Sequence, residues 1–219
     1  MKILEKYLSF WQDGCTIDQF KNWCGDSQAP FKKSIRIYAK NKGYKSVLDC
    51  GAGVYSEYYG FKEDGYSVEY TAIEITPSYI EFGLENDIKV LNCSVDDMPF
   101  DEKKFDCCLC LDVLNHQYDY RQAIKEMLRV TKKEVIISFF KPFEEDAKLN
   151  AYYSGNYKLE NTPLGLIEHR MVDTEGETTC IYNFINKKKM IEFLDGLEIK
   201  YNFGLASDSK VILFLQHDK

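Results

Sequence analysis

The sequence predicts a doubly wound α/β domain, in which a mostly parallel sheet of seven strands has helices on both faces and an antiparallel edge strand. Short apolar stretches alternate along the chain with segments of helical periodicity, a pattern typical of a parallel sheet with crossover helices. A turn with two glycines directly follows the first of these stretches. The chain has 219 residues, 45% of them hydrophobic, which is enough to bury one large core.

Residues 1–43 are expected to form a helical cap ahead of the sheet. Phe20, Trp23 and Cys24 make an apolar cluster on one helix. Pro30 lies near the start of a second helix that Gly43 ends. Proline suits the first turn of a helix, and glycine suits the position just after its last residue.

Residues 44–140 are expected to form the core of the sheet. The segment 106–112 is nearly all apolar, as a parallel strand buried on both faces should be. The segment 120–130 has helical spacing, with Ala123, Ile124, Met127 and Leu128 on one face. In chain order, the expected elements are strands at 45–50, 68–75, 89–93, 106–112 and 134–140, and helices at 56–62, 77–86 and 120–130.

The rest of the single domain divides into an insert and a C-terminal part. Residues 142–182 break the strand–helix rhythm, and an insert of this length is usually functional, so we expect it on the substrate side. Within it, 165–172 and 177–182 are expected to pair as a hairpin. Residues 183–219 should supply a helix at 187–194 and two strands, 198–203 and 211–216, that pair in antiparallel fashion at the edge.

Composition and cysteine usage narrow the class of protein. The formal charge is −7 and the pI is about 5.1, which disfavours a nucleic-acid partner. No apolar run approaches the ~18 residues of a membrane span, and residues 1–11 do not resemble a secretory signal. Cys107 and Cys110 are three apart and would point to opposite faces of a strand, so no metal site is predicted. We interpret the cysteines as buried hydrophobes of a reducing compartment and expect a cytoplasmic protein.

The loop after the first strand carries the strongest functional signal. Gly51 and Gly53 let the backbone turn sharply and approach a ligand, and the following helix start offers unpaired N–H groups. Asp49 lies two residues before this loop, where a carboxylate suits a cationic amine better than a pyrophosphate. Glu74 ends the second strand, 21 positions after Gly53, where an acidic residue takes ribose hydroxyls.

With these residues the chain resembles the class I S-adenosylmethionine-dependent methyltransferases of the small-molecule type, which have a Rossmann-like fold. The resemblance covers about residues 46–140 and rests on four motifs in order, at 47–53 (Val-Leu-Asp-Cys-Gly-Ala-Gly), 71–77, 94–100 and 105–116. It implies S-adenosylmethionine as cofactor. The positions implied to contact it are Asp49, Gly51, Ala52, Gly53, Tyr55, Glu74, Ile75, Ser94, Val95, Asp96 and Leu111.

The chain departs from the family pattern at two positions. Tyr55 stands where a third glycine is common, and its phenol is expected to pack over the cofactor or the substrate. Ser94 stands where the adenine motif usually has aspartate. A hydroxyl accepts a hydrogen bond more weakly than a carboxylate, so Asp96 is an alternative reader of the adenine.

His116 and Asp112 are the candidates for general base, because both follow the fourth strand on the substrate side. The alternatives are local packing for His116 and capping of the next turn for Asp112. Tyr152 and Tyr153 are candidates for an aromatic wall over the acceptor, or for a small core of the insert. Arg170 could pair with an anionic group of the substrate, or be a solvated surface charge.

The sequence therefore predicts an enzyme that moves a methyl group to an oxygen or nitrogen of a small polar acceptor, with a sugar or nucleotide-sugar favoured. It is expected to act as a monomer or homodimer, without nucleic-acid or membrane partners. The alternatives are a methyltransferase for protein or RNA, and a non-catalytic subunit of the same fold. A nicotinamide enzyme is disfavoured by Asp49 and by Ser56, which stands where such enzymes have a third glycine.

Overall fold

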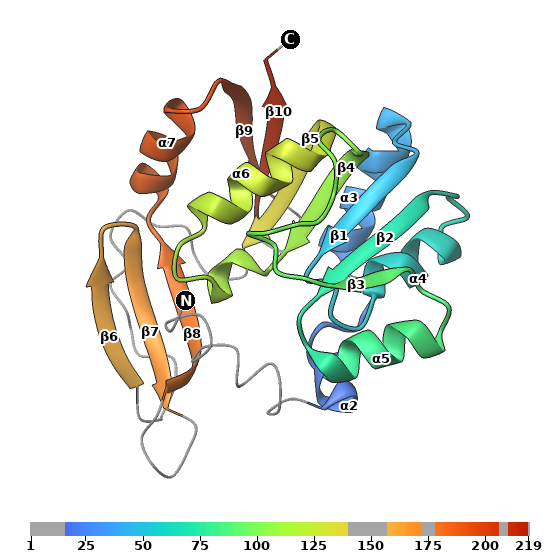
Figure 1. Cartoon of the computed structure of the whole chain (residues 1–219), viewed down its shortest axis with the longest axis horizontal. Coiled ribbons are helices and arrows are strands. Elements are labelled where there is room, and N and C mark those ends of the chain that lie inside the picture. Colours follow the sequence, from blue (N-terminus) through green and yellow to red (C-terminus); the bar gives the residue numbers. More distant parts are fainter. Residues whose placement is uncertain (1–15, 140–156, 172–177, 206–209, 219) are drawn as a thin grey trace.

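A seven-stranded sheet with strand order β3-β2-β1-β4-β5-β10-β9 forms the centre of the protein (Figure 1). The structure is a computed structural model that describes residues 16–139, 157–171, 178–205 and 210–218. The strands of the sheet are β1 (Ser46–Cys50), β2 (Glu69–Glu74), β3 (Val90–Asn92), β4 (Phe105–Leu111), β5 (Thr131–Phe139), β9 (Ile199–Leu205) and β10 (Val211–His217). The predicted doubly wound, mostly parallel architecture is confirmed.

The helices cover both faces of this sheet. They are α2 (Ile17–Cys24), α3 (Pro30–Lys42), α4 (Ser56–Glu63), α5 (Pro77–Glu85), the 3-10 turn η1 (Leu114–His116), α6 (Arg121–Val130) and α7 (Lys187–Asp195). Residues of α6 and α7 pack in one hydrophobic cluster, and residues of α3 and α4 pack in the other. No helix in the described ranges is long and apolar enough to cross a membrane.

The direction of strand order reverses between β1 and β4. From β1, the chain runs outward through β2 to β3 on one side of the sheet. It then returns to the other side of β1 and continues through β4 to β5. In open α/β sheets the crevice at the carboxyl ends of the strands beside such a switch point is where ligands bind. Asp49, Glu74 and Leu111 lie at these strand ends, so the topology brings the predicted motif residues to one edge.

The final two strands form the predicted antiparallel pair. β10 lies between β5 and β9 and is antiparallel to both. Val211, the first residue of β10, is therefore opposite Phe139, the last residue of β5. Lys210, the residue directly before β10, thus lies at the same edge of the sheet as the carboxyl ends of the parallel strands.

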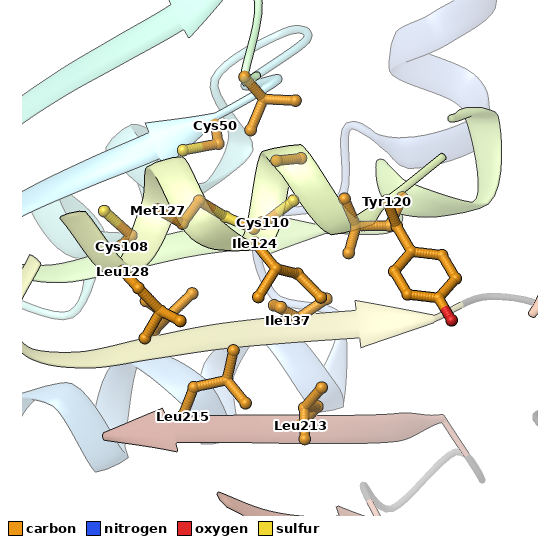
Figure 2. Close-up of a cluster of buried hydrophobic side chains, with 14 of the residues drawn as sticks. Cys50, Cys108, Cys110, Tyr120, Ile124, Met127, Leu128, Ile137, Leu213 and Leu215 are labelled. Carbon is orange, nitrogen blue, oxygen red and sulfur yellow. The ribbon is translucent and has the colours of Figure 1, made fainter. Parts of the chain in front are cut away.

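Alternation along β4 divides its side chains between the two cores. Cys107 and Leu109 belong to the cluster beneath α3 and α4, whereas Cys108 and Cys110 belong to the cluster beneath α6. Figure 2 shows Cys108 and Cys110 near Cys50 and Met127. The prediction that Cys107 and Cys110 point to opposite faces is confirmed.

A second, three-stranded antiparallel sheet follows β5 in the sequence. Its strands are β6 (Tyr157–Thr162), β7 (Gly165–Met171) and β8 (Thr178–Ile185), in that order. The β7–β8 hairpin was predicted and β6 was not, because residues 157–162 mix charged and polar residues without a clear strand pattern. Asn115 Nδ2 donates to the carbonyl of Asn183 over 3.0 Å, and Asn183 Nδ2 donates to the carbonyl of Gln117 over 3.0 Å. These bonds fix β8 beside η1.

Tyr55 is a core residue, and the expectation that its phenol would lie over a ligand is corrected. Its backbone is left-handed, with φ of 61°, at the position that caps α4. The ring is fully buried, and its hydroxyl donates to the carbonyl of Tyr79 over 2.6 Å. The ring also lies 6.3 Å from that of Phe82 on α5. Tyr55 therefore anchors α5 to the turn after β1.

This packing makes Gly83 intolerant of a larger side chain. A Cβ at Gly83 would lie 2.5 Å from Tyr55 Oη and 2.6 Å from its Cζ. We expect Gly83→Ala to destabilise the protein by about 1–2 kcal/mol, because overpacking outweighs the ~1 kcal/mol that alanine gains in a helix. Chemical denaturation measures this change. Gly196→Ala, whose Cβ would have contacts of 3.4 Å or more, is the control, and equal stability of the two variants would contradict the prediction.

Candidate active site

A cavity of about 740 Å³ opens at the carboxyl ends of β1, β2 and β4. Every predicted cofactor position lines it except Tyr55 and Val95. His116 and Asp112 line it as well. The predicted positions on the lining are Asp49, Gly51, Ala52, Gly53, Glu74, Ile75, Ser94, Asp96, Leu111, Asp112 and His116.

The glycine loop is held by backbone hydrogen bonds and by close neighbours. The N–H groups of Gly51 and Ala52 donate to the carbonyl of Ile73 over 2.9 and 3.2 Å. Gly51 and Gly53 have φ of 70° and 55°, a region that favours glycine. A Cβ at Gly51 would lie 2.7 Å from Val113, and one at Gly53 would lie 2.4 Å from Phe20. Both positions therefore need glycine, because the backbone has a positive φ there and because a side chain would meet close neighbours.

Glu74 holds this loop against the end of β2. Its Oε2 accepts from the N–H of Gly53 over 2.8 Å. Its Oε1 accepts from the N–H groups of Ile75 and Thr76 over 2.8 and 3.1 Å. Oε2 has only one of these donors and keeps a second lone pair, so this fixed group can still accept a hydrogen bond from a ligand hydroxyl in the cavity.

The carboxyl group of Asp49 is buried and lies near other acidic groups. It is 3% exposed, and Tyr70 Oη donates to its Oδ2 over 2.5 Å. Burial raises the pKa of Asp49 to about 7, and the charges of Glu57 and Glu74 act in the same direction. The hydrogen bond from Tyr70 and the charge of Lys32 oppose the shift. A cation bound in the cavity would favour the carboxylate form.

Of the three predicted adenine-motif residues, Ser94 and Asp96 line the cavity and Val95 does not. Ser94 Oγ donates to Asp96 Oδ1, and both residues line the cavity. The two candidates for this role therefore act as one coupled pair. Val95 is 5% exposed and packs in the hydrophobic cluster beneath α6. Contrary to the prediction, its side chain does not line the cavity.

Asp112 forms an ion pair that was not predicted from the sequence. Its carboxylate accepts from Lys210 Nζ and, over 2.8 Å, from Ser138 Oγ. Its backbone is left-handed, with φ of 62°. Lys210 Nζ also lies 4.1 Å from the centre of the Phe31 ring. The antiparallel direction of β10 places Lys210 here, which is a signal available only once the strand order is known.

His116 lies on η1 with its ring orientation fixed. Its Nδ1 is 3.1 Å from the carbonyl oxygen of Ile181 on β8. Because a carbonyl can only accept, Nδ1 carries the proton and Nε2 has the lone pair of the neutral ring. The ring also meets Tyr182 edge to face, with centroids 5.0 Å apart. This tautomer suits a proton acceptor.

The N-terminal cap contributes more to the cavity than expected. Phe20 and Trp23 of α2 and Lys32 of α3 line it. Trp23 is 64% exposed and α2 buries none of its residues, so the predicted apolar cluster lines the cavity. Ser56 and Glu57 at the start of α4 line it too. None of Lys32, Ser56 and Glu57 was predicted as a site residue.

The predicted substrate residues fall largely outside what the structure describes. Tyr152 and Tyr153 lie outside the described residues. Arg170 lies on β7, paired with Tyr157 and Cys180, and its side chain is not described. Within the described ranges, no group of three or more His, Cys, Asp or Glu side chains could hold a metal ion.

Comparison with known proteins shows which family the core of the chain resembles. Residues 48–139 match the sequence profile of a family described as a methyltransferase domain. This match covers β1 to β5 and the cavity edge built from them. Residues 48–139 are therefore similar to a methyltransferase domain.

Individual relatives extend the likeness beyond that domain. The chain is 20% identical over 216 residues to the uncharacterized protein MJ1123 of Methanocaldococcus jannaschii, covering 93% of this chain and 94% of that protein. Its fold is similar to the sugar N-methyltransferase KedS8 of a Streptoalloteichus species, with a TM-score of 0.65, 12% identity and 94% coverage of both chains. It is also similar to 1,6-didemethyltoxoflavin-N1-methyltransferase of Burkholderia thailandensis, with a TM-score of 0.57, 15% identity, and 100% and 86% coverage.

The raised pKa of Asp49 predicts a pH-dependent stability. Between about pH 4 and pH 7 the folded state keeps a proton that the unfolded state has lost, so the free energy of unfolding falls as pH rises. Asp49→Asn removes this loss. Measured by denaturant at about pH 5 and pH 8, the variant should gain roughly 2–3 kcal/mol over wild type between the two. Exposed Asp101→Asn is the control, and a pH-independent difference for Asp49→Asn would contradict the prediction.

Proposed function

We propose that the protein transfers the methyl group of S-adenosylmethionine to an oxygen or nitrogen of a small polar acceptor. The observation that carries this proposal is that one cavity joins two different sets of side chains. Buried carboxylates at the ends of β1 and β2 line one part, and polar residues that follow β4 line another. The first part suits the cofactor and the second suits an acceptor.

The residues of the first part fit the chemical parts of the cofactor. Asp49 offers a buried negative charge for the ammonium group. Glu74 offers acceptors for ribose hydroxyls, and the Ser94–Asp96 pair offers polar atoms for the adenine. When bound, the cofactor supplies an electrophilic methyl group, so the protein has mainly to align the acceptor and exclude water.

On the acceptor side we assign His116 as the proton acceptor. Its Nδ1 faces a carbonyl, so Nε2 has the lone pair that a general base needs. Both Asp112 oxygens already accept hydrogen bonds, from Ser138 and Lys210. Asp112 is therefore assigned a positioning role, in which it holds Lys210 at the cavity wall.

A sugar or nucleotide-sugar remains the preferred acceptor class. Gln117, Tyr118, Asp119 and Gln122 line the cavity beyond His116, and such side chains donate to and accept from hydroxyl groups. The fold is shared with a sugar N-methyltransferase. The net charge of −7 does not favour an acceptor in RNA.

The role of Glu74 can be tested by cofactor binding. Glu74→Gln removes the charge but keeps the size, and we expect it to weaken binding of S-adenosylhomocysteine about 10–100-fold in calorimetric titration, because charge-assisted hydrogen bonds to the ribose are lost. Glu69→Gln, at the exposed start of the same strand, should bind as wild type does. NADH should not bind. Unchanged affinity of Glu74→Gln would remove Glu74 from the site.

The role of His116 can be tested by separating turnover from binding. Transfer of labelled methyl groups to a panel of amino sugars, sugars and nucleotide-sugars would first identify an acceptor. His116→Asn should then lower kcat about 10²–10⁴-fold while S-adenosylhomocysteine affinity changes less than about threefold.

The control for His116 is His217→Asn. The His217 ring lies 3.0 Å from the Leu128 and Thr131 carbonyls and does not line the cavity. This variant should keep wild-type turnover. If His116→Asn also kept wild-type turnover, the general-base assignment would be wrong.

A further inference from the structure

Lys32 carries a buried charge that no carboxylate of the described residues neutralises by a direct ion pair. The residue is 7% exposed. Its Nζ donates to the carbonyl of Cys24 over 2.5 Å and to Ser56 Oγ over 2.6 Å. Both acceptors are neutral, and an ammonium group has three donors. The carboxylates of Asp49 and Glu57 are near enough to feel this charge but form no direct ion pair with it. Burying an ammonium group without such a partner is costly, so this arrangement favours a bound anion.

The surroundings of this ammonium also favour an anion. Ser56 is the first residue of α4, and no side chain caps this helix. The first N–H groups of a helix point outward with a partial positive charge. Lys32 and the start of α4 thus present positive potential to the same wall of the cavity.

Negative groups stand beside this positive wall. Glu57, one residue further along α4, is 2% exposed and lines the cavity. Its Oε2 lies 3.3 Å from Arg36 Nη1, whereas its Oε1 has no hydrogen-bond partner among the described residues. Asp49 lines the same cavity. The region therefore offers both a cation and unsatisfied carboxylate atoms, which matches a ligand bearing both charges.

We propose that Lys32 binds the carboxylate of the amino-acid part of the cofactor, while Asp49 and Glu57 take its ammonium group. This assignment rests on the proposed function and deepens it. It adds a cofactor-binding residue from α3, outside the matched residues 48–139. It also makes the site selective for a nucleoside that carries an intact α-amino acid.

The experiment compares two ligands that differ by one group. S-adenosylhomocysteine and its decarboxylated analogue, S-adenosyl-3-thiopropylamine, are titrated calorimetrically into the wild-type protein and into Lys32→Met. Wild type should prefer the carboxylate-bearing ligand about 30-fold, as one buried charge-assisted contact implies. Lys32→Met should lose most of this preference and bind the analogue within about threefold of wild type.

Two controls address folding and helix effects. Lys33→Met changes the adjacent, exposed residue of α3 and should keep the wild-type preference. Lys32→Gln removes the charge and keeps a hydrogen-bond donor, so it serves if the methionine variant fails to fold. Thermal unfolding without ligand should show Lys32→Met at least as stable as wild type, because it removes a buried charge.

The outcomes separate the two proposals. Unchanged binding of S-adenosylhomocysteine by Lys32→Met, or an equal loss for both ligands, would overturn the assignment of Lys32 and leave the proposed function standing. If the wild-type protein bound neither ligand, the proposed function would fail, and the assignment would fail with it.

Discussion

The rest of the site depends on the hydrogen bonds that the carboxylate of Glu74 accepts. It accepts from the N–H groups of Gly53, Ile75 and Thr76, and so joins the glycine loop after β1 to the end of β2. The loop in turn packs closely against Val113 at Gly51 and against Phe20 of α2 at Gly53. Since a buried carboxylate must be satisfied, these hydrogen bonds hold Glu74 and the glycine loop in place together.

The other charged side chains of the site are likewise held by hydrogen bonds within the protein. Asp49 has one donor in Tyr70, Asp112 has Lys210 and Ser138, and Lys32 has two neutral acceptors. Each of these groups costs free energy to bury, and each lines the cavity. A cavity lined by such groups favours ligands of complementary charge over neutral ones.

The sheet and its motif residues could be predicted because they depend on local patterns. Apolar runs and glycine turns indicated the parallel strands, and strand ends necessarily meet at one edge. Tyr55 was misjudged because its burial depends on Tyr79 and Phe82 of α5, a contact between elements that no spacing reveals. Lys32 was missed because it lies in α3 beside the apolar positions Phe31 and Ile35, where a lysine is normally read as solvated.

The antiparallel direction of β10 has a consequence for the order of assembly. β9 pairs with β10 alone in the described sheet, and β5 gains its second neighbour only from β10. During synthesis, both strands must therefore wait with open edges until residues 211–217 leave the ribosome. Lys210 reaches Asp112 by the same step. This ion pair at the cavity wall thus forms only after residue 210 has been synthesised, whereas the cavity-lining residues of β1, β2 and β4 come earlier in the chain.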